Sequence, residues 1–147
     1  MKLASWVFFA IFALALLQVT GFGQEMEVTI DVLEPTDEPG ELSPGLSYLK
    51  ESIDRSPLKY RNYLELATAF RSIPLGREET ISFHLRQKIK VVIIPNKVEK
   101  GIVSFRLRLW SGNSQILDTE LSLARRGTVM IGAPGKPNLI IAVSEGF

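Results

Sequence analysis

Two alternating stretches, residues 102–110 and 115–123, constrain the fold of this chain more than any other feature. In the first stretch every second side chain is apolar, namely Val103, Phe105, Leu107 and Leu109. In the second stretch the matching positions are Leu117, Thr119, Leu121 and Leu123. The turn between them contains Gly112, which can take a positive φ. This pattern predicts an antiparallel hairpin with one face against a core and the other in solvent.

Other segments are also typical of strands, and short turns separate most of them. They are residues 26–33, 60–70, 80–86, 89–94, 128–131 and 139–143. Segment 60–70 is ambiguous, because Leu64-Glu-Leu-Ala67 favours a helix whereas Tyr63 and Phe70 favour a strand, and we expect the strand. Residues 95–101 are expected to form a loop. The chain is therefore predicted to be mainly β, an antiparallel sandwich or small barrel of seven or eight strands.

The sequence divides into three parts. Residues 1–23 are expected to be a signal peptide, residues 24–45 an acidic strand with a Pro/Gly-rich linker, and residues 46–147 the β-domain. Because the linker follows strand 26–33, that strand is expected to be an add-on arm. One short helix, about residues 45–54, is predicted by an apolar stripe of Leu46, Leu49 and Ile53.

The N-terminus predicts export. Lys2 precedes an apolar run from Trp6 to Leu17, and Gly21 and Gly23 stand at the minus-three and minus-one positions of a cut before Gln24. The alternative is an uncleaved membrane anchor over residues 3–22. The chain has no cysteine and no Asn-x-Ser/Thr sequence, which favours a bacterial envelope over a eukaryotic secretory route. We expect a periplasmic or extracellular location, with membrane contact only through residues 3–22 if they are retained.

Charge is divided unevenly along the chain. Residues 25–54 carry nine acidic side chains and one basic one, whereas residues 55–147 carry 15 basic and seven acidic ones. The basic part could face the acidic segment, an envelope protein or an anionic surface polymer. Nucleic acid is not expected as a partner, since no recognised nucleic-acid-binding motif is present.

Catalytic and cofactor motifs are absent from the sequence. No metal site is expected, because His84 is the single histidine and there is no cysteine. No cofactor is expected either, since the glycines at 132 and 135 are not followed by Lys-Ser/Thr. The enzymatic alternative is a small secreted hydrolase that uses His84 with Asp118 or Glu120.

The outer face of the 102–123 hairpin is the predicted binding surface. Arg106 and Arg108 are expected to lie opposite Asp118 and Glu120 across the two strands. Trp110 falls on the same outward side, where the short helix or the N-terminal arm could cover it. The candidate binding residues are Arg106, Arg108, Trp110, Asp118, Glu120, Arg125 and Arg126.

Part of the chain, about residues 102–143, resembles known proteins. Phe105-Arg-Leu-Arg-Leu109, Leu117-Asp-Thr-Glu-Leu-Ser-Leu123 and Arg126-Gly-Thr-Val-Met-Ile-Gly132 resemble a pattern in small exported β-rich bacterial proteins of unassigned role. The Gly127-Thr-Val-Met-Ile-Gly132 piece is also similar to the strand–turn segment near the end of the secretin β-domain. The chain is too short for a secretin's periplasmic domains and pore, so the resemblance implies an envelope β-domain near a secretion or surface-assembly system. We therefore expect an exported, non-enzymatic binding or assembly module of the bacterial envelope.

Overall fold

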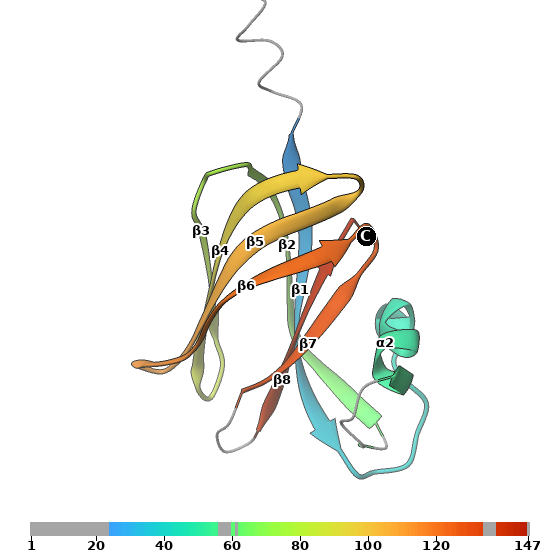
Figure 1. Ribbon diagram of the computed structural model, residues 1–147. Helices are drawn as coiled ribbons and strands as arrows, with labels where there is room; N and C mark the ends of the chain where they lie inside the picture. Colours follow the sequence, from blue (N-terminus) through green and yellow to red (C-terminus); the bar gives the residue numbers. More distant parts are fainter. Residues whose placement is uncertain (1–23, 56–59, 61, 134–137, 147) are drawn as a thin grey trace, which may run out of the picture.

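The computed structural model describes residues 24–55, 60, 62–133 and 138–146, which form eight strands and one short helical segment (Figure 1). The strands make two four-stranded antiparallel sheets that pack face to face as a sandwich. The mainly β prediction is confirmed, in its sandwich form, because the two sheets do not join into a closed barrel. The expected signal peptide, residues 1–23, lies outside the described residues.

Strands that follow one another in sequence also lie next to one another in space. The first sheet, here the β1 sheet, has the order β2 (Asn62–Pro74), β1 (Glu25–Thr36), β8 (Leu139–Glu145), β7 (Thr128–Ala133). The second, here the β5 sheet, has the order β3 (Glu79–His84), β4 (Lys88–Glu99), β5 (Ile102–Ser111), β6 (Ser114–Ala124). The chain passes between the sheets at the β2–β3 and β6–β7 connections. Two edge strands meet at each of these seams without a hydrogen-bonded ladder.

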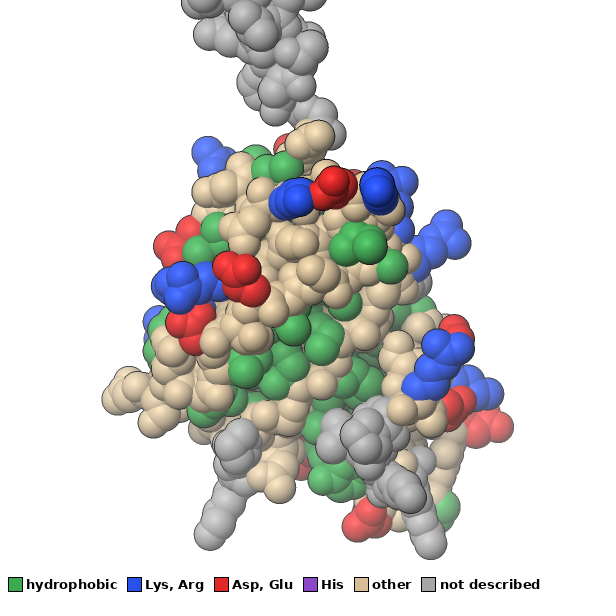
Figure 2. All heavy atoms as spheres, viewed as in Figure 1, with side chains coloured by type: hydrophobic (Ala, Val, Ile, Leu, Met, Phe, Trp, Pro, Cys, Tyr) green, Lys and Arg blue, Asp and Glu red, His purple; other side chains and the backbone are tan. Residues whose placement is uncertain are grey.

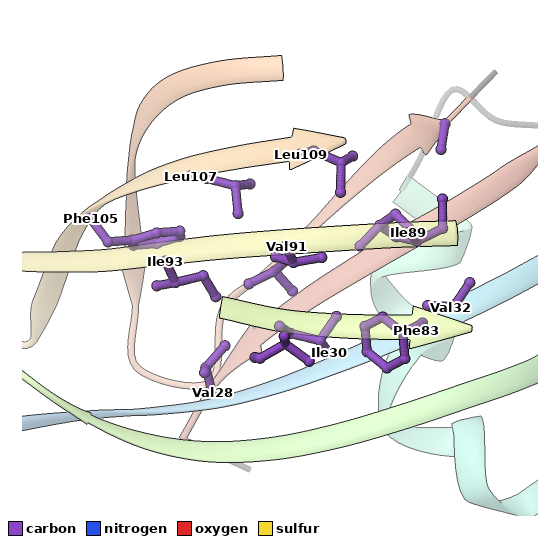
Figure 3. Close-up of a cluster of buried hydrophobic side chains, with 14 of the residues drawn as sticks. Val28, Ile30, Val32, Phe83, Ile89, Val91, Ile93, Phe105, Leu107 and Leu109 are labelled. Carbon is purple, nitrogen blue, oxygen red and sulfur yellow. The ribbon is translucent and has the colours of Figure 1, made fainter. Parts of the chain in front are cut away.

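The core lies between the two sheets and is built from the inward side of each alternating strand. Val28, Ile30 and Val32 of β1 face Ile89, Val91 and Ile93 of β4 and the apolar side chains of β5 (Figure 3). Phe105, Leu107 and Leu109 are all 0% exposed, as the alternation predicts. Burial of apolar area on this scale is the main source of stability in a chain without disulfides.

The helical segment covers the outer side of the β1 sheet. A 3₁₀ turn, η2 (Pro44–Leu49), continues into α2 (Lys50–Arg55), close to the predicted bounds. Leu46 and Leu49 are buried against Leu33, Tyr63, Ile140 and Ala142. A helix this short is not stable alone, so this second apolar cluster holds it in place.

Strand β1 is not an add-on arm, so that expectation is wrong. It pairs with β2 on one side and with β8 on the other, which makes it a central strand of its sheet. Met26, Val28, Ile30 and Val32 are each 0% exposed. The acidic side chains of Glu25, Glu27 and Asp31 occupy the other face of this strand.

The expected loop at residues 95–101 is also wrong. Strand β4 continues to Glu99, with a bulge between Pro95 and Lys97, after which pairing with β5 resumes. A bulge accommodates a proline, which has no N–H to donate to a ladder. The true turn is only Lys100-Gly101, where both residues have positive φ. The predicted strand at 60–70 is present from Asn62 onward, and β2 continues to Pro74.

The β6–β7 seam exposes part of the core. Figure 2 shows hydrophobic side chains gathered in the middle of the face where β6 and β7 diverge, with the charged groups toward its margins. The partly buried residues at this seam are Leu117, Leu121, Leu123, Val129 and Ile131.

Candidate functional site

The outer face of the β5 sheet holds most of the predicted binding residues. Side chains from alternate positions of β4, β5 and β6 lie side by side there, because directly paired residues share a face of the sheet. Arg106 is opposite Glu120, and Arg108 is opposite Asp118, so the predicted cross-strand register is confirmed.

The strongest polar contact on this face is diagonal. Arg106 donates two hydrogen bonds to Asp118, from Nε to Oδ1 and from an Nη to Oδ2, each of 2.9 Å. This bidentate bond, more than the charge alone, holds the pKa of Asp118 below its usual range and raises the pKa of Arg106. Glu120 adds a weaker attraction to Arg106. Asp118 therefore stays ionised and fixes the plane of the Arg106 guanidinium.

Arg108 lies between two carboxylates. Its nitrogens are 3.7 Å from Asp118 Oδ1 and 3.8 Å from Glu78 Oε1. Val92, directly opposite on β4, is only 5% exposed although it stands on the solvent-facing side. The charged groups of both arginines are thus compensated by nearby acids.

Trp110 stands on the outer face beside Lys90, its direct neighbour on β4. The Lys90 ammonium nitrogen is 4.3 Å from the centre of the indole ring, a cation–π contact. The expected cover from the short helix or the N-terminal strand is wrong, because both belong to the other sheet. The tryptophan is partly exposed and is covered on one side by a lysine.

Arg125 and Arg126 do not join this group. They are exposed in the β6–β7 turn, beyond the pairing of Ile102 with Ala124, whereas Trp110 pairs with Gln115 at the other end. Eight residues of β5 separate the two ends, which is about 27 Å. The two arginines instead line a hollow of about 300 Å³ with Glu27, Glu145 and Gly146.

The structure does not bring His84 to either carboxylate of the hydrolase alternative. His84 is on β3 and Asp118 and Glu120 are on β6, the two opposite edges of the sheet. Three strand spacings separate these edges, about 14 Å across the sheet alone. Direct proton transfer needs hydrogen-bond distance. Within the described part of the chain, no group of three His, Cys, Asp or Glu side chains is arranged to hold a metal ion.

A buried acidic side chain was not foreseen. Asp31 is 2% exposed on the outer side of β1, and its Oδ2 has no hydrogen-bond partner. Burial raises the pKa of Asp31 to about 6; a hydrogen bond with Thr68 opposes the rise, and Glu65 adds to it. Alternation alone assigned Asp31 to solvent, and nothing local in the sequence signals that neighbouring strands enclose it.

An exposed apolar edge was also missed. Strand β2 is an edge strand of 13 residues, and Leu64, Leu66 and Phe70 on it are 49%, 38% and 53% exposed. The sequence contains the indication, because apolar residues occur on both sides of the predicted strand 60–70 and only one side of a strand can face the core.

No family model, curated protein or solved structure matches this chain. In the described ranges, no helix is both long enough and apolar enough to cross a bilayer.

Proposed function

We propose that this protein is an exported, non-enzymatic binding module of the bacterial envelope, working with a secretion or surface-assembly system. Export is supported by the sequence of residues 1–23, and the lack of cysteine favours a bacterial envelope over a eukaryotic secretory route. The link to an assembly system is supported by the resemblance of residues 102–143. The observation that carries the proposal is Trp110, a large side chain on the solvent face of β5, in contact with Lys90 and on the same face as Arg106 and Arg108.

This face has the properties of a binding surface prepared in advance. Trp and Arg are the residues that most often anchor protein interfaces. Asp118 already fixes Arg106 by two hydrogen bonds, so little side-chain freedom remains to be lost when a partner binds. None of these side chains contributes to the core, which lies on the opposite side of the sheet.

The hydrolase alternative is less well supported. It requires His84 within hydrogen-bond reach of Asp118 or Glu120, and the sheet order separates them. A catalytic role for Asp118 would also compete with its bidentate bond to Arg106.

A second mode of binding is favoured by a separate observation. Strand β2 offers a long free edge with three exposed apolar side chains, which suits the addition of a strand from a partner. This mode uses the β1 sheet and the first uses the β5 sheet, so crosslinking residues placed on each sheet can distinguish them.

Site-specific photo-crosslinking in the native cell tests the proposal. One variant carries the crosslinking residue at position 115, beside Trp110, and the other carries it at position 70 on β2. We expect an adduct with an envelope-assembly component from position 115, lost when Trp110→Ala is added. An adduct from position 70 alone assigns binding to the β2 edge. If neither position yields an adduct, the binding-module proposal is wrong.

Intact-mass measurement of the exported protein tests the cleavage. A mass that begins at Gln24 agrees with a signal peptide, whereas a full-length mass in the membrane fraction assigns residues 3–22 to an anchor.

A further inference from the structure

The charges on the outer face of the β5 sheet are not compensated evenly. Arg106 and Arg108 on β5 contact Asp118 on β6, and Arg108 also contacts Glu78, just before β3. Toward the β3–β4 turn, Lys88 and Lys90 stand on β4 with no such partners. Among the residues that the structure describes, no ion pair includes either lysine. One half of the face is therefore neutralised and the other half is basic.

The sheet register gathers the basic half into one strip. Lys88 and Lys90 are two residues apart on the same side of β4, about 7 Å along the strand. His84 lies directly opposite Lys88 on β3, and Trp110 lies directly opposite Lys90 on β5. We call His84, Lys88, Lys90 and Trp110 the lysine strip. The residues of β6 that flank Trp110, Gln115 and Ile116, carry no charge.

We propose that the lysine strip binds an anionic glycan, a linear polymer with a carboxylate on its repeating sugar. This inference rests on the proposed function and names its partner class. Two lysines on the same side of one strand suit a polymer whose carboxylates repeat along its chain. The Lys90 ammonium lies over one face of the Trp110 indole, and the partly exposed ring offers apolar surface on which a sugar ring can pack.

An anionic membrane is a poorer match for the same charges. Adsorption to a lipid surface by a few lysines is weak unless apolar side chains insert beside them. The exposed large apolar residues of the described chain are Tyr60, Leu64, Leu66, Phe70 and Ile102. Tyr60 precedes β2, Leu64, Leu66 and Phe70 belong to β2, and Ile102 is at the end of β5 away from Trp110. None of these five stands in the lysine strip, and the apolar side chain of the strip, Trp110, is only partly exposed and is covered on one side by Lys90.

The test compares two double variants with the same change in net charge. Lys88→Gln with Lys90→Gln removes the lysine strip, and Lys97→Gln with Lys100→Gln removes two lysines from the other end of β4 and its turn. Binding to immobilised polygalacturonate is measured by biolayer interferometry at low salt, about 50 mM, and at high salt, about 500 mM. Circular dichroism and thermal unfolding confirm that each variant folds.

We expect the wild-type protein to bind the polymer at low salt and to release it at high salt. The strip variant should bind at least about tenfold more weakly, and the control variant should stay within about twofold of wild type. Equal losses of affinity in both variants would show that only net charge matters, and they would refute the proposed site. The site is also refuted if the strip variant binds as well as wild type, or if the wild-type protein does not bind the polymer.

Binding to vesicles that contain phosphatidylglycerol tests whether the anionic partner is a lipid surface instead of a glycan. Tighter binding to vesicles than to polymer, lost in the strip variant, assigns the strip to a membrane and refutes the glycan proposal. The crosslink from position 115 to a protein partner is a separate readout. If that adduct forms while polygalacturonate does not bind, the proposed function stands and this inference fails.

Discussion

Replacing Asp31 with asparagine should stabilise the protein at neutral pH. The side chain is 2% exposed, and burial raises its pKa from 3.8 to about 6. A rise of about two pKa units corresponds to about 3 kcal/mol of differential free energy between the two protonation states. Because the pKa is higher in the folded state, the folded protein binds the proton more tightly than the unfolded chain. The contribution of Asp31 to stability is therefore most favourable below pH 4, becomes less favourable as the pH rises from about 4 to about 6, and changes no further above that.

Asp31→Asn removes the charge while keeping the size and a polar group that can face Thr68 and Glu65. At pH 7 the variant should be more stable than wild type by up to about 3 kcal/mol, an upper value because the amide makes its own imperfect contacts. At pH 4, where Asp31 is protonated in the folded state, the difference should largely vanish. Urea unfolding followed by circular dichroism, at half-unit steps from pH 4 to 8, measures both quantities.

The matched control is Glu27→Gln, on the same side of the same strand but exposed. It should change stability by no more than about 0.5 kcal/mol at any of these pH values. The difference between wild type and Asp31→Asn isolates this one group from the other carboxylates. An Asp31→Asn variant that is less stable at pH 7, or a difference that grows as the pH falls, would refute the reasoning.

Three further predictions concern stability and need only the same unfolding measurements. Asp118→Asn removes the partner of Arg106 and should cause a small loss of folding stability that shrinks in high salt. Because folding lowers the pKa of Asp118, its stabilising contribution is present at neutral pH and disappears as the pH falls through the acid range. A loss of stability that does not depend on salt contradicts this account. Phe105→Ala empties the middle of the core and should cost about 3–5 kcal/mol, so a cost below about 1 kcal/mol would mean that the ring is not enclosed. Gly127→Ala places a methyl group 2.7 Å from the Ala124 carbonyl oxygen and should destabilise the β6–β7 turn. Gly132→Ala is the control, because a methyl group there meets nothing within 4 Å. Equal losses of stability in the two variants would contradict the predicted clash.

The strands were predictable from the sequence where the signal is local. The hairpin of β5 and β6, including the register that sets Arg108 opposite Asp118, follows from alternation around one short turn. The place of β1 was not predictable in this way. Its partner β8 lies more than 100 residues away, and alternation reports which side of a strand is buried but not which strands flank it. The burial of Asp31 has the same cause, since it depends on neighbours that local pattern does not identify.

The charged residues of the binding face could also be predicted only in part, because the sequence pattern does not show which charges become paired. Alternation correctly placed the arginines, Trp110 and the acids of β6 on the outside, and it favoured the arginines as the binding groups. Folding gives those arginines carboxylate partners, one of them by a diagonal bond and another from Glu78, which lies outside the hairpin. A compensated charge gains little from a new anionic partner, because the new contact must replace an existing one. Among the described residues, no carboxylate pairs with Lys88 or Lys90, so an anionic ligand gains most at the lysine strip, at the end of the face away from Glu120.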